Sequence, residues 1–379
     1  MHVLIIPSWY FPPETNEIGG RMFHHLASGL REKDIDARIL FADFSPGSPF
    51  KKQVTFTEES GVPTWRVRQW FPPKFNKKMI EWWIGKYVNS ILDYFEKEGI
   101  PDIIHAQSYM AGMVCAELNR RTKIPFILSE RASSFITQNI PSRHASFIQN
   151  NLNAASAITC VSPGLKSYLA KYTNKPIEVI PNYYDPAIFY SDPNIPKYEK
   201  FTWVSVGEPA HIKGLDLLIK AFAKVKQQFI NIEMQLILVD RIRGQQELID
   251  LSKQLNIEKE ISWIGLVSQV QVAGILRQSH VLISASRTET FGKAILEAQA
   301  CGIPVVATKT DGATYIMSSQ EQGIMVELND IDALTHGMSE MYFNYQHYNP
   351  ASILSHVESR FRKNIVIQQW IDLYTKIGA

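Results

Sequence analysis

Residues 289–307 have the sequence ETFGKAILEAQACGIPVVA, and the apolar run HVLIS precedes them at residues 280–284. Gly292 is placed to open a short helix, and Gly302 with Pro304 is placed to close it before a second apolar strand. The order strand, loop, helix, strand predicts one unit of a parallel α/β sheet. Such sheets bind their ligands at the carboxyl ends of the strands, which is where the loop before this helix would lie.

Two glutamates stand eight positions apart here, Glu289 in the loop and Glu297 on the helix. At about 100° per residue the apolar positions share one side of the helix, whereas Glu297 falls on the other side with Lys293 and Thr290. We therefore expect the apolar side to pack on the sheet and Glu297 to face the loop that carries Glu289. Taken alone, a helical glutamate is more often a solvated surface residue.

The bulk composition is that of a soluble globular protein. The chain has 379 residues, which predicts two domains, and 45% of its residues are hydrophobic. A net charge of +2 gives no reason to expect nucleic acid as a partner. Cys115, Cys160 and Cys301 are far apart, which is typical of small buried residues in a reducing compartment. Without a signal-peptide pattern or an apolar run of about 18 residues, we expect a cytoplasmic protein.

The first half of the chain alternates predicted strands and helices. A helix follows Gly19 and Gly20, with apolar residues at helical spacing between Phe23 and Leu30. A glycine pair before a helix lets the backbone approach a ligand and points amide groups at it, although an ordinary flexible loop is the alternative. The segments predicted to hold strands are residues 2–6, 37–42, 101–107, 124–131, 154–162 and 176–182.

Residues 71–96 are rich in aromatic residues and lysines. Ile80 and Tyr87 belong to an apolar stripe at helical spacing, which predicts a core helix. The alternative is a helix that lies on an anionic membrane surface, because Lys77 and Lys78 accompany the aromatic residues.

The second half begins after an irregular segment. Residues 183–200 are rich in proline, aspartate and tyrosine without periodicity, which predicts an interdomain linker. Lys213 stands just before a helix that follows the strand at residues 201–206, and helix starts attract anions. A solvated lysine is the default for any single lysine. Further strands are expected at residues 232–239 and 260–264, and an amphipathic helix at residues 364–377.

Three segments resemble the donor-site signature of one large family: Ser286–Gly292, Glu297–Val306 and Asp311-Gly312. This family is the retaining glycosyltransferases of the GT-B fold, in the group 1 class, glycosyltransferase family 4. The resemblance implies an α/β protein with two Rossmann-like doubly wound domains that face a cleft. The implied parts are an acceptor-side domain at residues 1–182, a linker at 183–200, a nucleotide-sugar-binding domain at 201–358 and a terminal helix at 359–379 that crosses back to the first domain.

The resemblance also implies the chemistry and the site. A sugar would pass from a nucleotide-diphosphate sugar to a hydroxyl acceptor with retention, without a metal or another cofactor, and the leaving phosphate would take the acceptor proton. Glu289 and Lys213 would be catalytic: Glu289 would hold hydroxyls of the sugar and Lys213 the diphosphate. Glu297 would hold the ribose. The remaining implied donor-binding residues are Gly19, Gly20, Arg131, Thr290, Phe291, Gly292, Lys293, Gly265 and Leu266.

The sequence departs from the family pattern in three places. Arg131 stands where the family usually has a histidine that touches the donor sugar; it could bind phosphate or an acidic sugar, or form a structural ion pair. Glu208 stands where an arginine usually grips the diphosphate, and Arg241 or Arg243 could replace that arginine. A glycine-rich turn near residue 240 is missing. These departures motivate an alternative, a sugar-nucleotide-binding protein that has lost transfer activity.

The resemblance implies two partners, a nucleotide sugar and a carbohydrate or lipid-linked acceptor. Peripheral contact with the inner face of the membrane is one possibility. The implied setting is surface polysaccharide or glycolipid assembly. The acidic pairs Asp34/Asp36 and Asp330/Asp332 lie beside turns and are expected to be solvated. Among the histidines only His211, in the loop before Lys213, is kept as a weak candidate.

Overall fold

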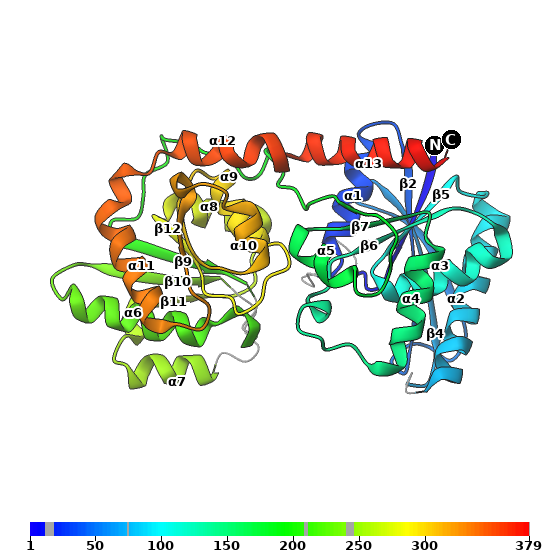
Figure 1. Cartoon of the computed structure of the whole chain (residues 1–379), viewed down its shortest axis with the longest axis horizontal. Coiled ribbons are helices and arrows are strands. Elements are labelled where there is room, and N and C mark those ends of the chain that lie inside the picture. Colours follow the sequence, from blue (N-terminus) through cyan, green and yellow to red (C-terminus); the bar gives the residue numbers. More distant parts are fainter. Residues whose placement is uncertain (12–18, 74–75, 208–210, 240–245, 379) are drawn as a thin grey trace. The chain divides into compact units, whose positions relative to one another are not determined.

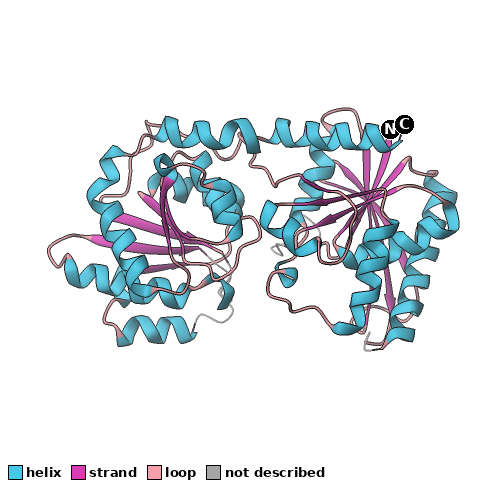
Figure 2. Ribbon diagram, viewed as in Figure 1, coloured by secondary structure: helices cyan, strands magenta, loops and turns pink. Residues whose placement is uncertain are grey.

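The computed structural model describes residues 1–11, 19–73, 76–207, 211–239 and 246–378. The chain divides into two compact units by its internal contacts. Unit 1 consists of Met1–Val161, Leu165–Ile180 and Ile367–Ala379, and unit 2 consists of Ser162–Gly164 and Pro181–Val366. Each unit has its own sheet with helices flanking the strands (Figure 2).

Unit 1 contains an 8-stranded sheet in the order β3-β4-β2-β1-β5-β6-β7-β8. All neighbouring strands are parallel except the antiparallel pair β3 and β4. The strands are β1 (His2–Pro7), β2 (Asp36–Ser45), β3 (Gln53–Glu59), β4 (Val62–Trp70), β5 (Ile103–Gln107), β6 (Phe126–Glu130), β7 (Ala157–Cys160) and β8 (Ile177–Val179). The helices are α1 (Arg21–Arg31), α2 (Lys77–Glu98), α3 (Tyr109–Thr122), α4 (Ala145–Ala154) and α5 (Pro163–Leu169), with the short turns η1 (Ser133–Phe135) and η2 (Ser142–His144).

Unit 2 contains a 6-stranded parallel sheet in the order β11-β10-β9-β12-β13-β14. Its strands are β9 (Phe201–Val206), β10 (Met234–Val239), β11 (Ile261–Ile264), β12 (Val281–Ser284), β13 (Val305–Thr308) and β14 (Gly323–Val326). Its helices are α6 (Leu215–Gln228), α7 (Gln246–Gln254), α8 (Gln269–Gln278), α9 (Lys293–Ala300), α10 (Asp311–Ile316), α11 (Ile331–Asn344) and α12 (Pro350–Phe361). Short turns complete it: η3 (His211–Lys213), η4 (Glu258–Glu260), η5 (Gln320–Gln322) and η6 (Tyr345–His347).

The strand order explains where each unit can bind a ligand. In unit 2 the chain adds strands on one side of β9, then returns to β12 on the other side, so the order reverses between β9 and β12. In unit 1 the same reversal falls between β1 and β5. Doubly wound sheets bind ligands outside the carboxyl ends of the strands at this switch point. The predicted α/β class with two doubly wound sheets is confirmed.

A last helix, α13 (Lys363–Gly378), completes the chain (Figure 1). From Ile367 onward it belongs to unit 1, where Trp370 and Tyr374 are buried. Arg362 has extended backbone angles and separates α13 from α12 of unit 2. The chain therefore returns to unit 1 through this helix after it has built unit 2.

Helix α2 buries Ile80, Trp83, Tyr87 and Ile91 among others, so the core-helix interpretation of residues 71–96 is confirmed, with the helix starting at Lys77.

The sequence analysis did not predict the hairpin of β3 and β4. Its turn has Ser60 and Gly61 at φ angles of 44° and 83°, the left-handed conformation of tight hairpin turns, and the Ser-Gly pair is a signal that could have indicated it.

The segment predicted as a linker, residues 183–200, contains neither a helix nor a strand, and it is packed on unit 2. The Lys197 Nζ donates to the backbone carbonyls of Arg277 and Ser279 at 2.9 and 2.8 Å. The guanidinium of Arg277 in turn lies 4.3 Å over the ring of Tyr190. Most of this segment is thus part of a folded unit.

Candidate active site

A lysine and a glutamate meet at the switch point of unit 2. Lys213 ends the short turn η3, which follows β9, and Glu289 lies in the loop between β12 and α9. The Lys213 Nζ donates to the Glu289 Oε2 at 2.5 Å, and the side chains are 28% and 16% exposed. Both line a small pocket together with Gly207 and Gly292. The structure thus brings together the two residues that the sequence analysis named as catalytic.

An arginine and an aspartate hold the turn that carries Lys213. Arg287 donates to both carboxylate oxygens of Asp216 at 2.8 Å, and its Nη1 also donates to the His211 carbonyl at 2.7 Å. The backbone N–H of Arg287 donates to the Ile212 carbonyl at 2.7 Å. These bonds connect the loop of Glu289 to the turn of Lys213. The ion pair lowers the pKa of Asp216, so the clamp is charged at neutral pH.

Two helices begin close in sequence to Lys213 and Glu289. In neither helix does the N-cap residue, a glycine, cap the helix with a side chain. Gly214 precedes α6 with φ of 64°, and Gly292 precedes α9 with φ of 91°. Both values lie in the left-handed region that favours glycine. A Cβ atom on Gly214 would also lie 2.0 Å from the Ala285 carbonyl oxygen. Helix starts present N–H groups and the positive end of the helix dipole, which favour an anion. At α6 the Asp216 carboxylate already accepts from the N–H groups of Asp216 and Leu217.

Glu297 on α9 is buried, with 7% of its surface exposed, which excludes the solvated interpretation. Burial raises the pKa of its carboxyl group above the ordinary value, and the Lys293 ammonium at 3.3 Å opposes that rise. The expectation of a one-sided apolar helix was incomplete, because every residue of α9 from Ile295 to Ala300 is buried. The reason is that α8, α10 and α12 also pack against this helix.

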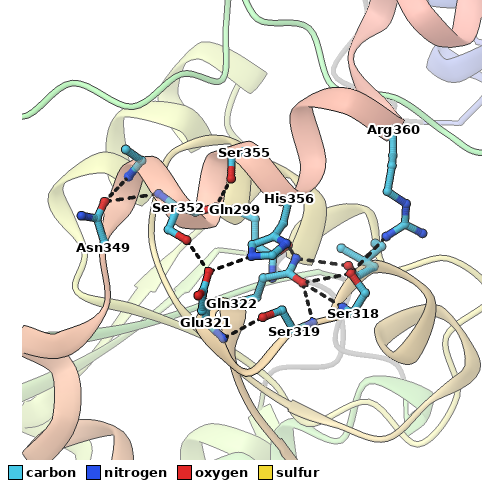
Figure 3. Close-up of polar contacts among 12 residues, drawn as sticks. Gln299, Ser318, Ser319, Glu321, Gln322, Asn349, Ser352, Ser355, His356 and Arg360 are labelled. Carbon is cyan, nitrogen blue, oxygen red and sulfur yellow. Dashed lines mark hydrogen bonds and ion pairs between the residues drawn. The ribbon is translucent and has the colours of Figure 1, made fainter.

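Polar contacts hold the side of α9 that faces α12 (Figure 3). Gln322 donates its side-chain amide to the Gln299 Oε1 at 2.7 Å, and both side chains are fully buried. Next to them, Glu321 accepts from His356 and from Ser352, both on α12. The turn η5 is therefore fixed to α9 on one side and to α12 on the other.

The loop between Glu289 and α9 is held by close backbone packing. The Gly312 N–H donates to the Glu289 carbonyl at 2.9 Å, and a Cβ atom on Gly312 would come within 2.6 Å of the backbone of Phe291. The Phe291 ring is buried against the rings of Tyr315 and Phe361, with centroids 6.2 and 5.7 Å away. The loop thus has a fixed course to Gly292.

Comparison with known proteins identifies this arrangement. Residues 19–188 match the profile of glycosyltransferase family 4, and residues 190–351 match the profile of the glycosyl transferases group 1. The chain belongs to this family of glycosyltransferases. Together the two matches extend over nearly the whole chain.

Individual relatives agree with the family. D-inositol 3-phosphate glycosyltransferase of Arthrobacter sp. is 23% identical over 344 residues, which cover 83% of this chain and 80% of that protein. Sucrose-phosphate synthase from Thermosynechococcus elongatus has a TM-score of 0.82 at 19% identity, covering 100% of this chain and 99% of that one. An Anabaena protein in complex with UDP-glucose has a TM-score of 0.74 at 17% identity, covering 99% of this chain and 100% of that one. The fold is GT-B, and the chain is a glycosyltransferase that depends on a sugar nucleotide.

The other predicted donor-site residues of unit 2 lie between Glu289 and the first turn of α9, or directly after β11. Thr290, Phe291 and Lys293 lie between Glu289 and the first turn of α9. Gly265 and Leu266 follow β11, which is two strands away from β9, and they do not line the pocket of Lys213.

Three predicted residues belong to unit 1 and are placed there at the ends of β1 and β6. Gly20 precedes α1 with φ of 84°, and a Cβ atom on it would lie 2.7 Å from the Trp9 carbonyl oxygen. Gly19 accepts a backbone hydrogen bond from Phe11 at 3.0 Å. Arg131 donates its Nε to the Gln107 Oε1 at 3.2 Å. The structure thus shows a backbone hydrogen bond between Phe11 and Gly19 and a left-handed Gly20 where α1 begins.

Some candidates lie outside the described residues, namely Glu208, Arg241 and Arg243. His211 is exposed and supplies its carbonyl to Arg287. The two acidic pairs have structural roles: Asp36 pairs with Arg38, and Asp330 caps α11 by accepting from the Ala333 N–H. The three cysteines are buried and free, as expected. In the described part of the chain, no helix is long and apolar enough to cross a membrane.

Proposed function

We propose that this glycosyltransferase moves a hexose from a nucleotide-diphosphate sugar to a hydroxyl group with retention and without a metal ion. The main observation behind this proposal is the Lys213–Glu289 ion pair at the switch point of unit 2. It joins a cation suited to the diphosphate and a carboxylate suited to sugar hydroxyls in one pocket. Helix α6 starts shortly after Lys213 in the sequence, and α9 starts shortly after Glu289.

Sugar transfer of this kind requires that the departing diphosphate be stabilised as its negative charge develops. Lys213 supplies a full positive charge, and the N–H groups at the two helix starts supply fixed dipoles that need no reorganisation. The Arg287–Asp216 clamp keeps the lysine turn in place before the donor arrives. This supply of positive charge supports a site that works without a metal.

The acceptor hydroxyl would attack the anomeric carbon as the bond from that carbon to the diphosphate oxygen breaks. The leaving diphosphate oxygen would take the proton of the hydroxyl, so no protein nucleophile is needed. Glu289 is the one carboxylate among the described residues that line the pocket, and it is already paired with Lys213. A paired carboxylate is suited to holding sugar hydroxyls.

The experiment is a screen of UDP-glucose, ADP-glucose and GDP-mannose for binding and slow hydrolysis, each with manganese and with chelator. Retention is tested by determining the anomer of the transferred or released sugar by NMR. The alternative, a binding protein without transfer activity, would bind a nucleotide sugar and leave it intact. Activity that vanishes with chelator and returns with manganese would contradict the metal-independent proposal.

We also propose a lipid-linked acceptor, in surface polysaccharide or glycolipid assembly. The support for this part is the surface of α2. Trp82 on α2 is 51% exposed and lines an open surface pocket with Lys77, Lys78 and Met79. The Lys86 Nζ lies 5.6 Å from the centroid of the Trp82 ring. Lysines beside an exposed tryptophan are suited to an anionic membrane interface. Binding of the protein to phosphatidylglycerol vesicles but not to phosphatidylcholine vesicles would support this part.

A further inference from the structure

Strand β3 is the outermost strand of the 8-stranded sheet of unit 1, and no strand of the described residues pairs with its outer edge. Its sequence is QVTFTEE, and every residue of the strand except Glu59 is exposed. Val54 and Phe56 are 40% and 52% exposed. The strand contains no proline, and no bulge interrupts its register with β4. A regular, partly apolar edge of this kind is a template for pairing with another strand.

The hairpin turn determines which backbone groups point to the outer edge. A two-residue turn connects Glu59 to Val62, and the residues that flank such a turn form a hydrogen-bonded pair. Bonded and non-bonded pairs alternate along an antiparallel ladder. The backbone N–H and C=O groups of Val54, Phe56 and Glu58 therefore point away from β4. A further strand at this edge would bond to these groups.

The even-numbered side chains of β3 lie on the face of the sheet that α2 covers. The Phe56 ring packs against Trp65 with centroids 6.1 Å apart, and Trp65 packs in turn against Tyr94 of α2. Lys52, just before the strand, donates to Asp93 of α2. Because side chains alternate along a strand, the other even-numbered residues share this face. In order, the row is Lys52, Val54, Phe56 and Glu58.

The charges around β3 complement an antiparallel copy of the same segment. Two lysines precede the strand and two glutamates end it, at residues 51, 52, 58 and 59. Thr55 is the centre of this segment, so an antiparallel copy centred there places the positive end of one copy against the negative end of the other. Glu59 already binds Arg66, so the pair that matters is Lys52 with Glu58.

A two-fold axis through Thr55 gives complementary pairs along the whole row. Val54 of each copy then stands opposite Phe56 of the other, with their outward backbone groups bonded, and Lys52 stands opposite Glu58 at both ends. An axis through Val54 would instead place Lys52 opposite Phe56, and an axis through Phe56 would place Val54 opposite Glu58. Of these three registers, only the one centred on Thr55 keeps apolar side chains away from charged ones.

We propose that two copies of this chain form a symmetric dimer through β3, antiparallel about Thr55, which joins their 8-stranded sheets edge to edge. Such an interface is isologous, so every contact occurs twice. The exposed apolar side chains of the edge are then covered, and its outward backbone groups gain partners. The dimer concerns unit 1 alone and does not rest on the proposed function.

The first test places a cysteine at the two-fold axis. In the dimer the two Thr55 residues form a non-hydrogen-bonded pair with Cα atoms about 4.5 Å apart, a separation at which a disulfide forms. Thr55→Cys should therefore give a covalent dimer when the full chain is oxidised with copper phenanthroline. The three native cysteines are buried and free, so the wild type should stay without a cross-link.

Thr57→Cys is the matched control, because Thr57 is an exposed threonine on the same face of the same strand as Thr55. In the proposed register the two copies of Thr57 lie about 14 Å apart along the strand, which no disulfide spans. The covalent dimer of Thr57→Cys should therefore form at least about tenfold more slowly than that of Thr55→Cys. Equal cross-linking of the two variants, or cross-linking of neither, would overturn the proposal.

The second test reverses the charged pair and measures dimerisation by sedimentation velocity from about 1 to 100 µM. The wild type should shift from monomer to dimer with concentration. Lys52→Glu places negative charges opposite each other, and Glu58→Lys places positive ones, so each variant alone should dimerise about tenfold more weakly. An equimolar mixture of the two variants should recover the wild-type affinity, because opposite charges then meet at both ends.

Lys33→Glu is the control for net charge, since Lys33 is exposed in the turn after α1. This variant should dimerise as the wild type does, and circular dichroism melts check that each variant is folded. A mixture of Lys52→Glu and Glu58→Lys that associates no more tightly than either variant alone would rule out this register. A wild type that stays monomeric throughout would overturn the dimer, and the charges at the ends of β3 would then protect the edge from pairing.

Discussion

At the residue scale, the central fact is that Lys213 and Glu289 are each other's partners before any donor is bound. Their side chains are partly exposed, so the pair is open to exchange with a ligand. An entering diphosphate brings about two negative charges to a lysine that Glu289 already neutralises. Binding therefore includes a competition between the diphosphate and the carboxylate for one ammonium group.

This competition gives opposite expectations for the two alanine variants. Lys213→Ala should weaken binding of a nucleoside diphosphate by about 10- to 150-fold, because hydrogen bonds to charged groups contribute about 1.5–3 kcal/mol. Glu289→Ala should leave that affinity unchanged or improve it, since the lysine loses its competitor, while hydrolysis of the sugar nucleotide falls. Calorimetry on both variants, with a hydrolysis assay, measures this. Weaker diphosphate binding in Glu289→Ala would show that the carboxylate orients the lysine.

Glu297 presents a second charge problem, because its carboxyl group is buried and its pKa is raised. The folded state keeps the proton up to a higher pH than the unfolded state does. Stability therefore falls as pH rises through the interval between the unfolded and the folded pKa, and the ionised form is destabilising at neutral pH.

Glu297→Gln should accordingly raise the melting temperature at pH 7–8. The gain in melting temperature should disappear below the ordinary carboxyl pKa of about 4.3, where the glutamate of the wild type is protonated and as neutral as the glutamine of the variant. If Glu297 holds the ribose, the same variant should bind nucleoside diphosphate more weakly. Melting curves from pH 4 to pH 8 check the first part, and a gain that persists at pH 4 would assign it to packing.

At the element scale, the Arg287–Asp216 clamp connects the turn η3 to the loop that carries Glu289. Arg287→Ala removes both charged bonds and the contact to the His211 carbonyl. Because the pair is partly exposed, its effect is discounted, and we expect nucleoside diphosphate affinity to fall about 5- to 10-fold. Lys224→Ala is the control, since it breaks an exposed pair with Asp332 on α6 and α11. If both variants bind nucleoside diphosphate with the same affinity, the clamp does not support the binding site.

The sequence could predict the elements of this site better than their connections. Gly292 as a helix opener, the strand at residues 201–206 and Lys213 before a helix are local signals, and all three are found. The Arg287–Asp216 clamp was missed, because its members are 71 residues apart in the sequence. The burial of Glu297 was only half predicted: periodicity assigns a helix side, but it does not reveal that α8, α10 and α12 all pack against α9.

Unit 1 shows the same limit. Strands were predicted at residues 101–107 and 124–131, and β5 and β6 lie within these ranges. The contact between His105 on β5 and Tyr374 was not visible, since two residues 269 positions apart leave no trace of their contact in the local sequence.

At the scale of the whole molecule, the two units differ in how the chain builds them. Unit 2 is nearly continuous from Pro181 to Val366 and has its own core around Trp203, Phe222 and Leu236. Unit 1 needs residues from Ile367 onward, where Trp370, Leu373 and Tyr374 are buried. The last helix is therefore a structural part of the first unit.

This difference predicts opposite behaviour for the two halves expressed as fragments. Residues 181–366 should fold alone and bind nucleoside diphosphate, because the core and the Lys213 site are both within them. Residues 1–180 should be unfolded or aggregated. Truncating one buried tryptophan costs about 3–5 kcal/mol, and a whole domain is stable by only about 5–15 kcal/mol, so losing Trp370, Leu373 and Tyr374 together is comparable to the whole margin.

A synthetic peptide of residues 363–379 added to fragment 1–180 provides the matched control. It should restore the cooperative melting transition, while the same peptide with Trp370→Ala and Tyr374→Ala should not, because the buried rings are what the fragment lacks. Circular dichroism melts with increasing peptide measure this. A fragment 1–180 that melts cooperatively without any peptide would mean that the sheet and its first five helices are sufficient, and that α13 is not needed for the stability of the unit.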